Sequence, residues 1–170
     1  MPHFKELRRA YGFDEVAIVP GELTINPELV ELGLEIGGFK FPIPFMASAM
    51  DAVVDPSFAI AMHNAGGPAV LNLEGVWTRY DDPASILQEV ASANRDEATI
   101  LLQKAYPAEI RDDLIARRIH EIKDGGGVAA VSVTPINTKR MAPIVQEAGA
   151  DIVFVQSTVT TARHESSSME

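Results

Sequence analysis

Four short apolar runs, separated by stretches with helical character, constrain the fold of this 170-residue chain more than any other feature. The runs begin at residues 43, 68, 128 and 152, and each is apolar on both faces, as central strands of a parallel sheet are. Strands that alternate with helices predict an α/β fold on a parallel sheet. Two architectures fit: a flavodoxin-like open sheet, and part of an eight-stranded (β/α) barrel, whose usual size is about 250 residues.

The segments between these strands carry the signals of helix ends. Asp55 and Pro56 predict the N-cap and first position of a helix that ends at Gly66. The run 98–105 fits either a strand or a continuing helix, because it is too short for periodicity to decide. Three more helices are expected: 81–94 with Pro83 at its start, 107–127 started by Pro107, and 137–151 with Pro143 in its first turn or bending it.

The chain divides into two expected parts. Residues 1–41 form an N-terminal extension with a short hairpin, which the pattern of residues 32–45 predicts with its turn at Gly37 and Gly38. Residues 42–170 contain the alternating strands and helices. The N-terminus lacks the apolar core of a secretory signal, and no segment reaches the roughly 18 apolar residues that a membrane span needs.

The composition argues against several classes of function for this chain. The chain has no cysteine, so it holds no disulfide, cysteine zinc site or cysteine nucleophile, which fits a cytoplasmic location. Its net charge is −10, which argues against a nucleic-acid partner. The histidines have no paired-ligand spacing, so no metal site is predicted; they are His3, His63, His120 and His164. Neither a Gly-rich dinucleotide fingerprint nor a P-loop is present.

Four sequence blocks follow one another along residues 13–158: "FDEVAIVP" (13–20), "PIPFMASAMDAVVD" (42–55), "AIAMHNAGGPAVLN" (59–72) and "EAGADIVFVQST" (147–158). In the second block a proline-flanked apolar run ends in Ser-x-Met-Asp at residues 48–51. In this order and at this spacing the four blocks resemble the IMP dehydrogenase/GMP reductase family, whose first-strand motif has that pattern.

The resemblance implies a (β/α)₈ TIM-type barrel, of which this chain supplies about the first four βα units. It implies that Ser48 and Met50 border a purine nucleotide site, where a serine hydroxyl bonds a ribose or phosphate oxygen and a methionine packs on a flat base. Ordinary core packing is the alternative for Met50. Asp51 lies beside that site in the family, or caps the turn after the strand, and is not expected to be catalytic.

The resemblance also implies a nicotinamide cofactor, NAD or NADP, bound near Gln156, Ser157 and Thr158. The family usually has an aspartate where Gln156 stands, and that aspartate contacts the cofactor ribose. The neutral amide therefore indicates a divergent subgroup, with altered cofactor preference or binding mode. The triplet Ser166–Ser168 either caps a helix or lies near the cofactor.

Two further departures limit the expectation. Residues 74–127 are too few for the regulatory cystathionine-β-synthase-type module that many family members insert here. A compact member without that module resembles the GMP reductases or related paralogues. In the loop 74–83, Trp77, Arg79 and Tyr80 either touch a ligand or anchor a surface loop, and the anchor is favoured. The family's cysteine nucleophile follows the sixth strand, and this chain ends after its fourth.

The expected parent is thus an oxidoreductase of IMP or GMP in purine nucleotide metabolism, homo-oligomeric, a tetramer in the family. The 170-residue chain alone, as a fragment or truncated product, is expected to be inactive. The alternatives are a non-catalytic half-barrel that pairs with itself or a partner, and an unrelated open-sheet binding domain. Open sheet edges would favour such pairing.

Overall fold

The computed structural model describes residues 8–157, which fall into two units divided between Glu31 and Leu32. The described part of the first unit has one regular element, the short 3₁₀ helix η1 (Pro27–Leu29). The second unit begins with the predicted hairpin: β1 (Leu34–Ile36) pairs antiparallel with β2 (Phe39–Phe41). Gly37 and Gly38 have φ values of 58° and 87°, which glycine adopts without steric cost.

The main sheet is parallel, which confirms the α/β class. Its strands are β3 (Val70–Asn72), β4 (Ala130–Val133) and β5 (Ile152–Val155). The prediction of a full strand from residue 43 is wrong, because this segment forms only a single parallel bridge, between Ala47 and Ala69. Pro42 and Pro44 have no N–H to give to a ladder, so pairing is confined to the residues after them.

The order of the strands separates the two expected architectures. Chain order and spatial order agree: the Ala47 bridge lies beside β3, β3 beside β4, and β4 beside β5. A flavodoxin-like sheet places its first strand between the second and third. Among the described residues the first strand position is instead at the edge, so the flavodoxin-like order is excluded for this part of the sheet.

The helices before residue 106 begin at side-chain caps. Helix α1 (Pro56–Asn64) starts where Asp55 accepts a hydrogen bond from Phe58 N at 2.6 Å, as predicted. Asp82 caps α2 (Pro83–Ser92). Asn94 and Glu97 form a reciprocal capping box at the start of α3 (Arg95–Ala105), so the ambiguous run 98–105 is a helix.

Two helix starts differ from the expectation. Helix α4 (Asp112–Asp124) begins five residues after Pro107, because tertiary bonds hold the preceding segment extended: Arg111 N donates to Thr78 O at 2.8 Å. Helix α5 (Pro135–Glu147) takes Pro135 as its first residue, which leaves Pro143 in its interior and not in the first turn. Pro143 lacks the N–H that would bond to the carbonyl four residues earlier.

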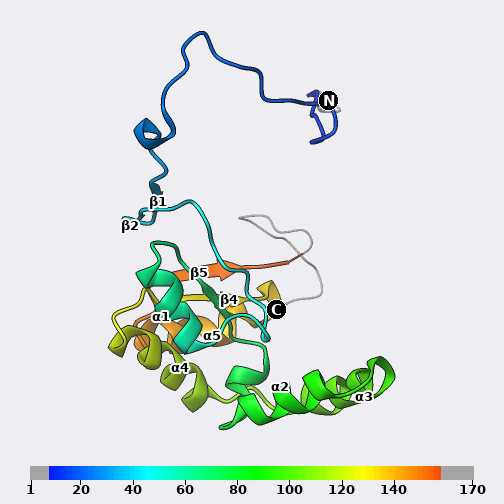
Figure 1. The fold of residues 1–170 in the computed structure, drawn as a ribbon. Coiled ribbons are helices and arrows are strands. Elements are labelled where there is room, and N and C mark those ends of the chain that lie inside the picture. The colour runs from blue at the N-terminus through cyan, green and yellow to red at the C-terminus, as the bar shows by residue number, and fades with distance from the viewer. Residues whose placement is uncertain (1–7, 158–170) are drawn as a thin grey trace, which may run out of the picture. The chain divides into compact units, whose positions relative to one another are not determined.

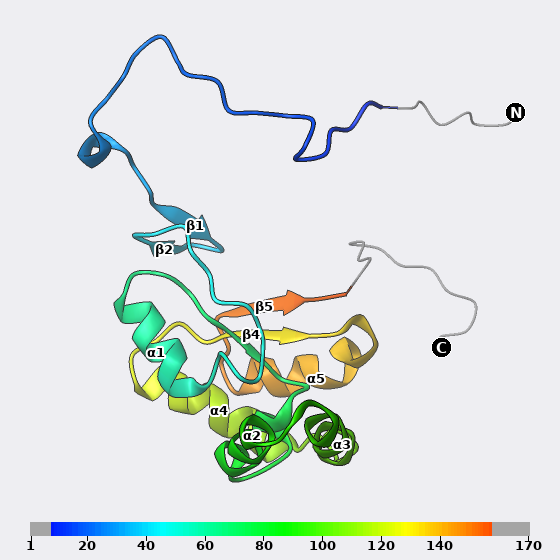
Figure 2. The same cartoon turned by 45° about the vertical axis from the view of Figure 1, so that its right-hand side comes forward.

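The core lies between the sheet and the helices α1, α4 and α5 (Figures 1 and 2). Alternate strand residues face these helices, among them the fully buried Leu71 and Val131, which pack with Ile119 and Met141. Helices α2 and α3 pair with each other and stand away from the sheet in both views. In the described residues no helix is both long and apolar enough to cross a membrane.

Candidate functional site

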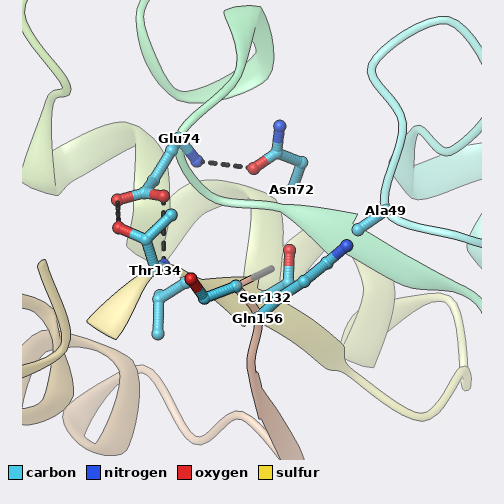
Figure 3. Close-up of a pocket in the computed structure, with 8 residues that line it drawn as sticks. Ala49, Asn72, Glu74, Ser132, Thr134 and Gln156 are labelled. Atoms are coloured by element: carbon cyan, nitrogen blue, oxygen red, sulfur yellow. Dashed lines mark hydrogen bonds between the residues drawn. The ribbon is translucent and has the colours of Figure 1, made fainter. Parts of the chain in front are cut away.

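A polar hollow of about 500 Å³ lies at the carboxyl ends of β3, β4 and β5. In parallel α/β sheets, residues that follow the strands at this end converge and form the ligand site. Figure 3 shows that side chains from all three strand ends meet there. The polar residues that line the hollow are Asn72, Glu74, Ser132, Thr134, Gln156 and Ser157.

An adjoining hollow of about 380 Å³ shares Ala49, Gln156 and Ser157 with the first and adds Ser48. The structure therefore brings Ser48 together with two of the predicted cofactor residues. Met50 lines neither hollow, and its side chain is 54% exposed. Thr158 and the Ser166–Ser168 triplet lie outside the described residues.

Asp51 is the most heavily bonded residue near the site. It is 9% exposed, and its Oδ2 accepts from Val76 N at 2.8 Å and from the Tyr106 hydroxyl at 2.6 Å. Its Oδ1 accepts from Asn72 Nδ2 at 3.1 Å, and its carbonyl accepts from Trp77 Nε1 at 2.9 Å. None of these bonds caps the turn that Asp51 itself belongs to, as the turn-capping alternative expected: the aspartate instead joins the loop after the first strand to the end of β3, to the segment that follows β3 and to the end of α3.

Glu74 extends this set of bonds to the next strand. Its backbone N donates to Asn72 Oδ1 at 3.0 Å, and its carboxylate accepts from Thr134 N at 3.0 Å and Thr134 Oγ1 at 2.9 Å (Figure 3). Asn137 Nδ2 also donates to that carboxylate. Thr134 is the N-cap of α5 and makes no cap bond with its own side chain, so Glu74 supplies the negative charge that a helix N-terminus favours.

The aromatic and basic residues of the loop 74–83 bond to the protein itself. Arg79 donates to Glu74 O and to Ala108 O, and the Tyr80 hydroxyl donates to Ala105 O at 2.8 Å. Arg118, 6% exposed, donates to Trp77 O and lies 5.6 Å from the Trp77 ring centroid. These contacts agree with the favoured loop-anchor interpretation.

The Tyr106 phenol has the most altered acidity near the site. Burial first, and then the hydrogen bond to Asp51 and its negative charge, raise the pKa of Tyr106 to about 12. The folded value lies above the ordinary 10.0, so the protonated phenol stabilises the fold below about pH 10. That contribution is lost as pH rises through 12.

We therefore expect Tyr106→Phe to remove part of the loss of stability between about pH 10 and pH 12. Alkaline unfolding of wild type and variant, followed by circular dichroism, measures this. Phenolate absorbance gives the titration of Tyr106 directly as the difference between the two proteins. An unchanged alkaline profile in the variant contradicts the assignment.

The chemistry of the hollow suits an uncharged, hydroxyl-rich group. Of the polar side chains that line it, those of Ser132, Gln156 and Ser157 form no hydrogen bond with the residues that the structure describes. Their hydroxyls and amide donate to and accept from ribose hydroxyls or a carboxamide. Its one carboxylate, Glu74, already accepts three side-chain or backbone donors. No lysine or arginine lines either hollow in the described residues, and no three His, Asp or Glu residues there gather as a metal site.

Sequence reasoning missed Asn72, Glu74, Ser132 and Thr134. A signal was present: each lies at or just after the end of an expected strand, where parallel sheets place their binding groups. The reach of Asp51 to Tyr106, across 55 positions, had no sequence signal.

These features define an α/β protein with sequential parallel strands and a polar site at their carboxyl ends. Residues 10–169 match the family model of the IMP dehydrogenase / GMP reductase domain. The chain belongs to the IMP dehydrogenase/GMP reductase family, which confirms the resemblance seen in its sequence.

Individual relatives agree with this assignment. An uncharacterized oxidoreductase of Mycobacterium tuberculosis is 34% identical over 96% of this chain and 45% of its own length. The IMP dehydrogenase of Methanocaldococcus jannaschii is 34% identical over 39% of this chain and 14% of its own. The crystal structure of an IMP dehydrogenase/GMP reductase-like protein from Corynebacterium glutamicum superimposes with a TM-score of 0.84 at 34% identity, covering 95% of this chain and 44% of that one. The chain thus spans less than half the length of each of these three proteins.

Proposed function

We propose that this chain supplies part of the nucleotide site of a nicotinamide-dependent oxidoreductase that acts on a purine nucleotide, IMP or GMP. The carrying observation is that Ser48 and the pair Gln156 and Ser157, more than 100 residues apart in sequence, line the same hollow at the carboxyl ends of the strands, and that Gln156 and Ser157 also line the adjoining one. In a (β/α)₈ barrel the active site lies at this end. The sequential strand order supports a barrel, which further strands would close.

In this proposal Ser48 contacts the nucleotide, while Gln156, Ser157 and Thr158 contact NAD or NADP. The side chains of Gln156 and Ser157 fit the uncharged ribose and carboxamide parts of such a cofactor, which supplies hydride transfer when bound. An amide at position 156 donates as well as accepts, unlike the carboxylate usual in the family. Met50 needs a different position from the described one to pack on a base in either hollow.

The chain has no cysteine, so the family's cysteine nucleophile has to come from outside these 170 residues. We accordingly expect turnover of IMP with NAD, or of GMP with NADPH, from the full-length protein and none from the 170-residue chain alone. Cofactor absorbance measures both. Turnover by the short chain contradicts the division of the site, and a full-length protein that turns over neither nucleotide contradicts the proposed reaction.

Binding tests the site without depending on catalysis. We expect Ser48→Ala to weaken the binding of IMP or GMP to the full-length protein by on the order of tenfold, the effect of one lost hydrogen bond to a bound ligand. Titration calorimetry measures it. Ser57→Ala is the control, because Ser57 is an exposed serine on α1 that lines neither hollow. Equal affinities of the two variants contradict the role of Ser48.

A second candidate, a non-catalytic assembly domain, is supported by one observation. The edge strand β5 leaves Val153 and Val155 exposed by 47% and 41%, and such edges favour association. Light scattering of the purified chain tests this candidate. A monomer that unfolds in one sharp transition counts against both the assembly domain and an unclosed barrel.

A further inference from the structure

The loop proposed to hold the nucleotide is tied to a helix pair that lies outside the sheet. The tie is Asp51, three residues after Ser48, whose Oδ2 accepts the Tyr106 hydroxyl at 2.6 Å. Tyr106 is the C-cap of α3, and α2 and α3 contact each other more than any part of the sheet. A short bond to a carboxylate is about twice as strong as one between neutral groups. The position of α3 is therefore coupled, through the Tyr106–Asp51 hydrogen bond, to residues 48–51, here called the Ser48 loop.

The link continues across the ends of the strands. Asn72 donates its amide N–H to Asp51 Oδ1 and accepts from Glu74 N with its amide oxygen, so both ends of this side chain are satisfied in only one orientation. Glu74 in turn accepts from Thr134 at the start of α5. One continuous line of bonds thus runs from Tyr106 to Thr134, and its last three members, Asn72, Glu74 and Thr134, line the first hollow.

We propose that Asp51 and Tyr106 are positioning residues, through which the α2–α3 hairpin holds the Ser48 loop in the geometry that binds the nucleotide. This inference rests on the proposed function, because it assumes a nucleotide at Ser48. Neither residue needs to touch the ligand. Asp51 has its carboxylate oxygens taken by Asn72, Val76 and Tyr106, and Tyr106 lines neither hollow.

The protein contains its own reporter of the loop position. Trp77 is the single tryptophan of these 170 residues, and its Nε1 donates to the Asp51 carbonyl at 2.9 Å. A shift of Asp51 changes the hydrogen bond and solvent exposure of this indole. The Trp77 emission spectrum therefore reports on the Asp51 loop whether or not a nucleotide is bound.

The test compares two tyrosine variants. Tyr106→Phe removes only the hydroxyl that bonds Asp51. Tyr80→Phe is the matched control, because its hydroxyl bonds the same end of α3, at Ala105 O and 2.8 Å, but does not touch Asp51. Ligand-free Trp77 emission is compared with wild type in the 170-residue chain, where Trp77 is the single tryptophan. Titration of IMP and of GMP and thermal unfolding are compared in the full-length protein.

We expect Tyr106→Phe to shift the Trp77 emission and to weaken nucleotide binding by on the order of tenfold. We expect Tyr80→Phe to lower the unfolding temperature comparably while leaving emission and affinity close to wild type. Equal effects of both variants on affinity, or no effect of either, overturn the positioning role. If wild type binds neither IMP nor GMP, the proposed function fails, and the ligand-free emission still decides whether Tyr106 holds the loop.

Discussion

Replacing Asp51 by alanine is expected to lower the free energy of unfolding by roughly 3 kcal/mol or more, since each buried donor left without a partner costs about 1–3 kcal/mol. The donors that lose their acceptor are Asn72 Nδ2, Val76 N and the Tyr106 hydroxyl. The effect is large because these groups belong to two separate segments, residues 72–76 and the end of α3, which the carboxylate joins to its own loop. Urea unfolding followed by circular dichroism measures it.

Asp55→Ala is the matched control for this substitution. Asp55 is an aspartate four residues along that caps α1 through one bond to Phe58 N, and loss of such a cap costs about 1 kcal/mol. The two variants remove the same chemical group from neighbouring positions. A loss at Asp51 no greater than the loss at Asp55 contradicts the network and would make Asp51 a simple turn cap.

The second large effect is expected at Gly75. Its φ of −91° is open to any residue, so backbone strain is not the constraint. A Cβ at this position overlaps Oδ1, Cγ and Oδ2 of Asp51, so Gly75→Ala has to push the carboxylate off Val76 N. We expect a loss of about 3 kcal/mol, at the upper end for overpacking of a buried site.

Gly33→Ala serves as the control for Gly75→Ala, because the nearest atom to its added Cβ is Phe41 O at 4.0 Å. It is expected to be neutral or stabilising by a few tenths of a kcal/mol up to about 1 kcal/mol. Since Gly75 and Asp51 act on the same contact, the double variant Asp51→Ala, Gly75→Ala should lose clearly less than the sum of the single losses. Full additivity would show that the two residues act independently.

The sequence predicted correctly those helix starts and turns that depend on residues at the same place in the chain, such as N-caps, prolines and glycines. The Asp55–Pro56 start of α1, Pro83 at the start of α2 and the Gly37–Gly38 turn were all found in the structure. The start of α4 was wrong because bonds from Arg79 and Arg111 hold residues 108–111 in an extended path, which no local pattern encodes. The first strand is shorter than its apolar residues indicate, because Pro42 and Pro44 have no N–H to donate to a neighbouring strand.

The candidate site was predictable only in part, and for a similar reason. Ser48 and Gln156 came from motifs that resemble a family, and the structure places both on adjoining hollows. Asp51 was expected only to lie near the site or cap a turn. Its partner Tyr106 follows the run 98–105, which by its sequence fits either a strand or a helix. A contact between residues 55 positions apart depends on how the α2–α3 hairpin folds back.

The central claim is that the carboxyl-end hollows bind a purine nucleotide and a nicotinamide cofactor. A crystal structure of the full-length protein grown with IMP and NAD tests it most directly. We predict the nucleotide in contact with Ser48 and the cofactor in contact with Gln156 and Ser157, with the Asp51–Tyr106 bond intact. Nucleotide bound elsewhere, or hollows filled by the protein's own side chains while nucleotide is bound, would contradict the account.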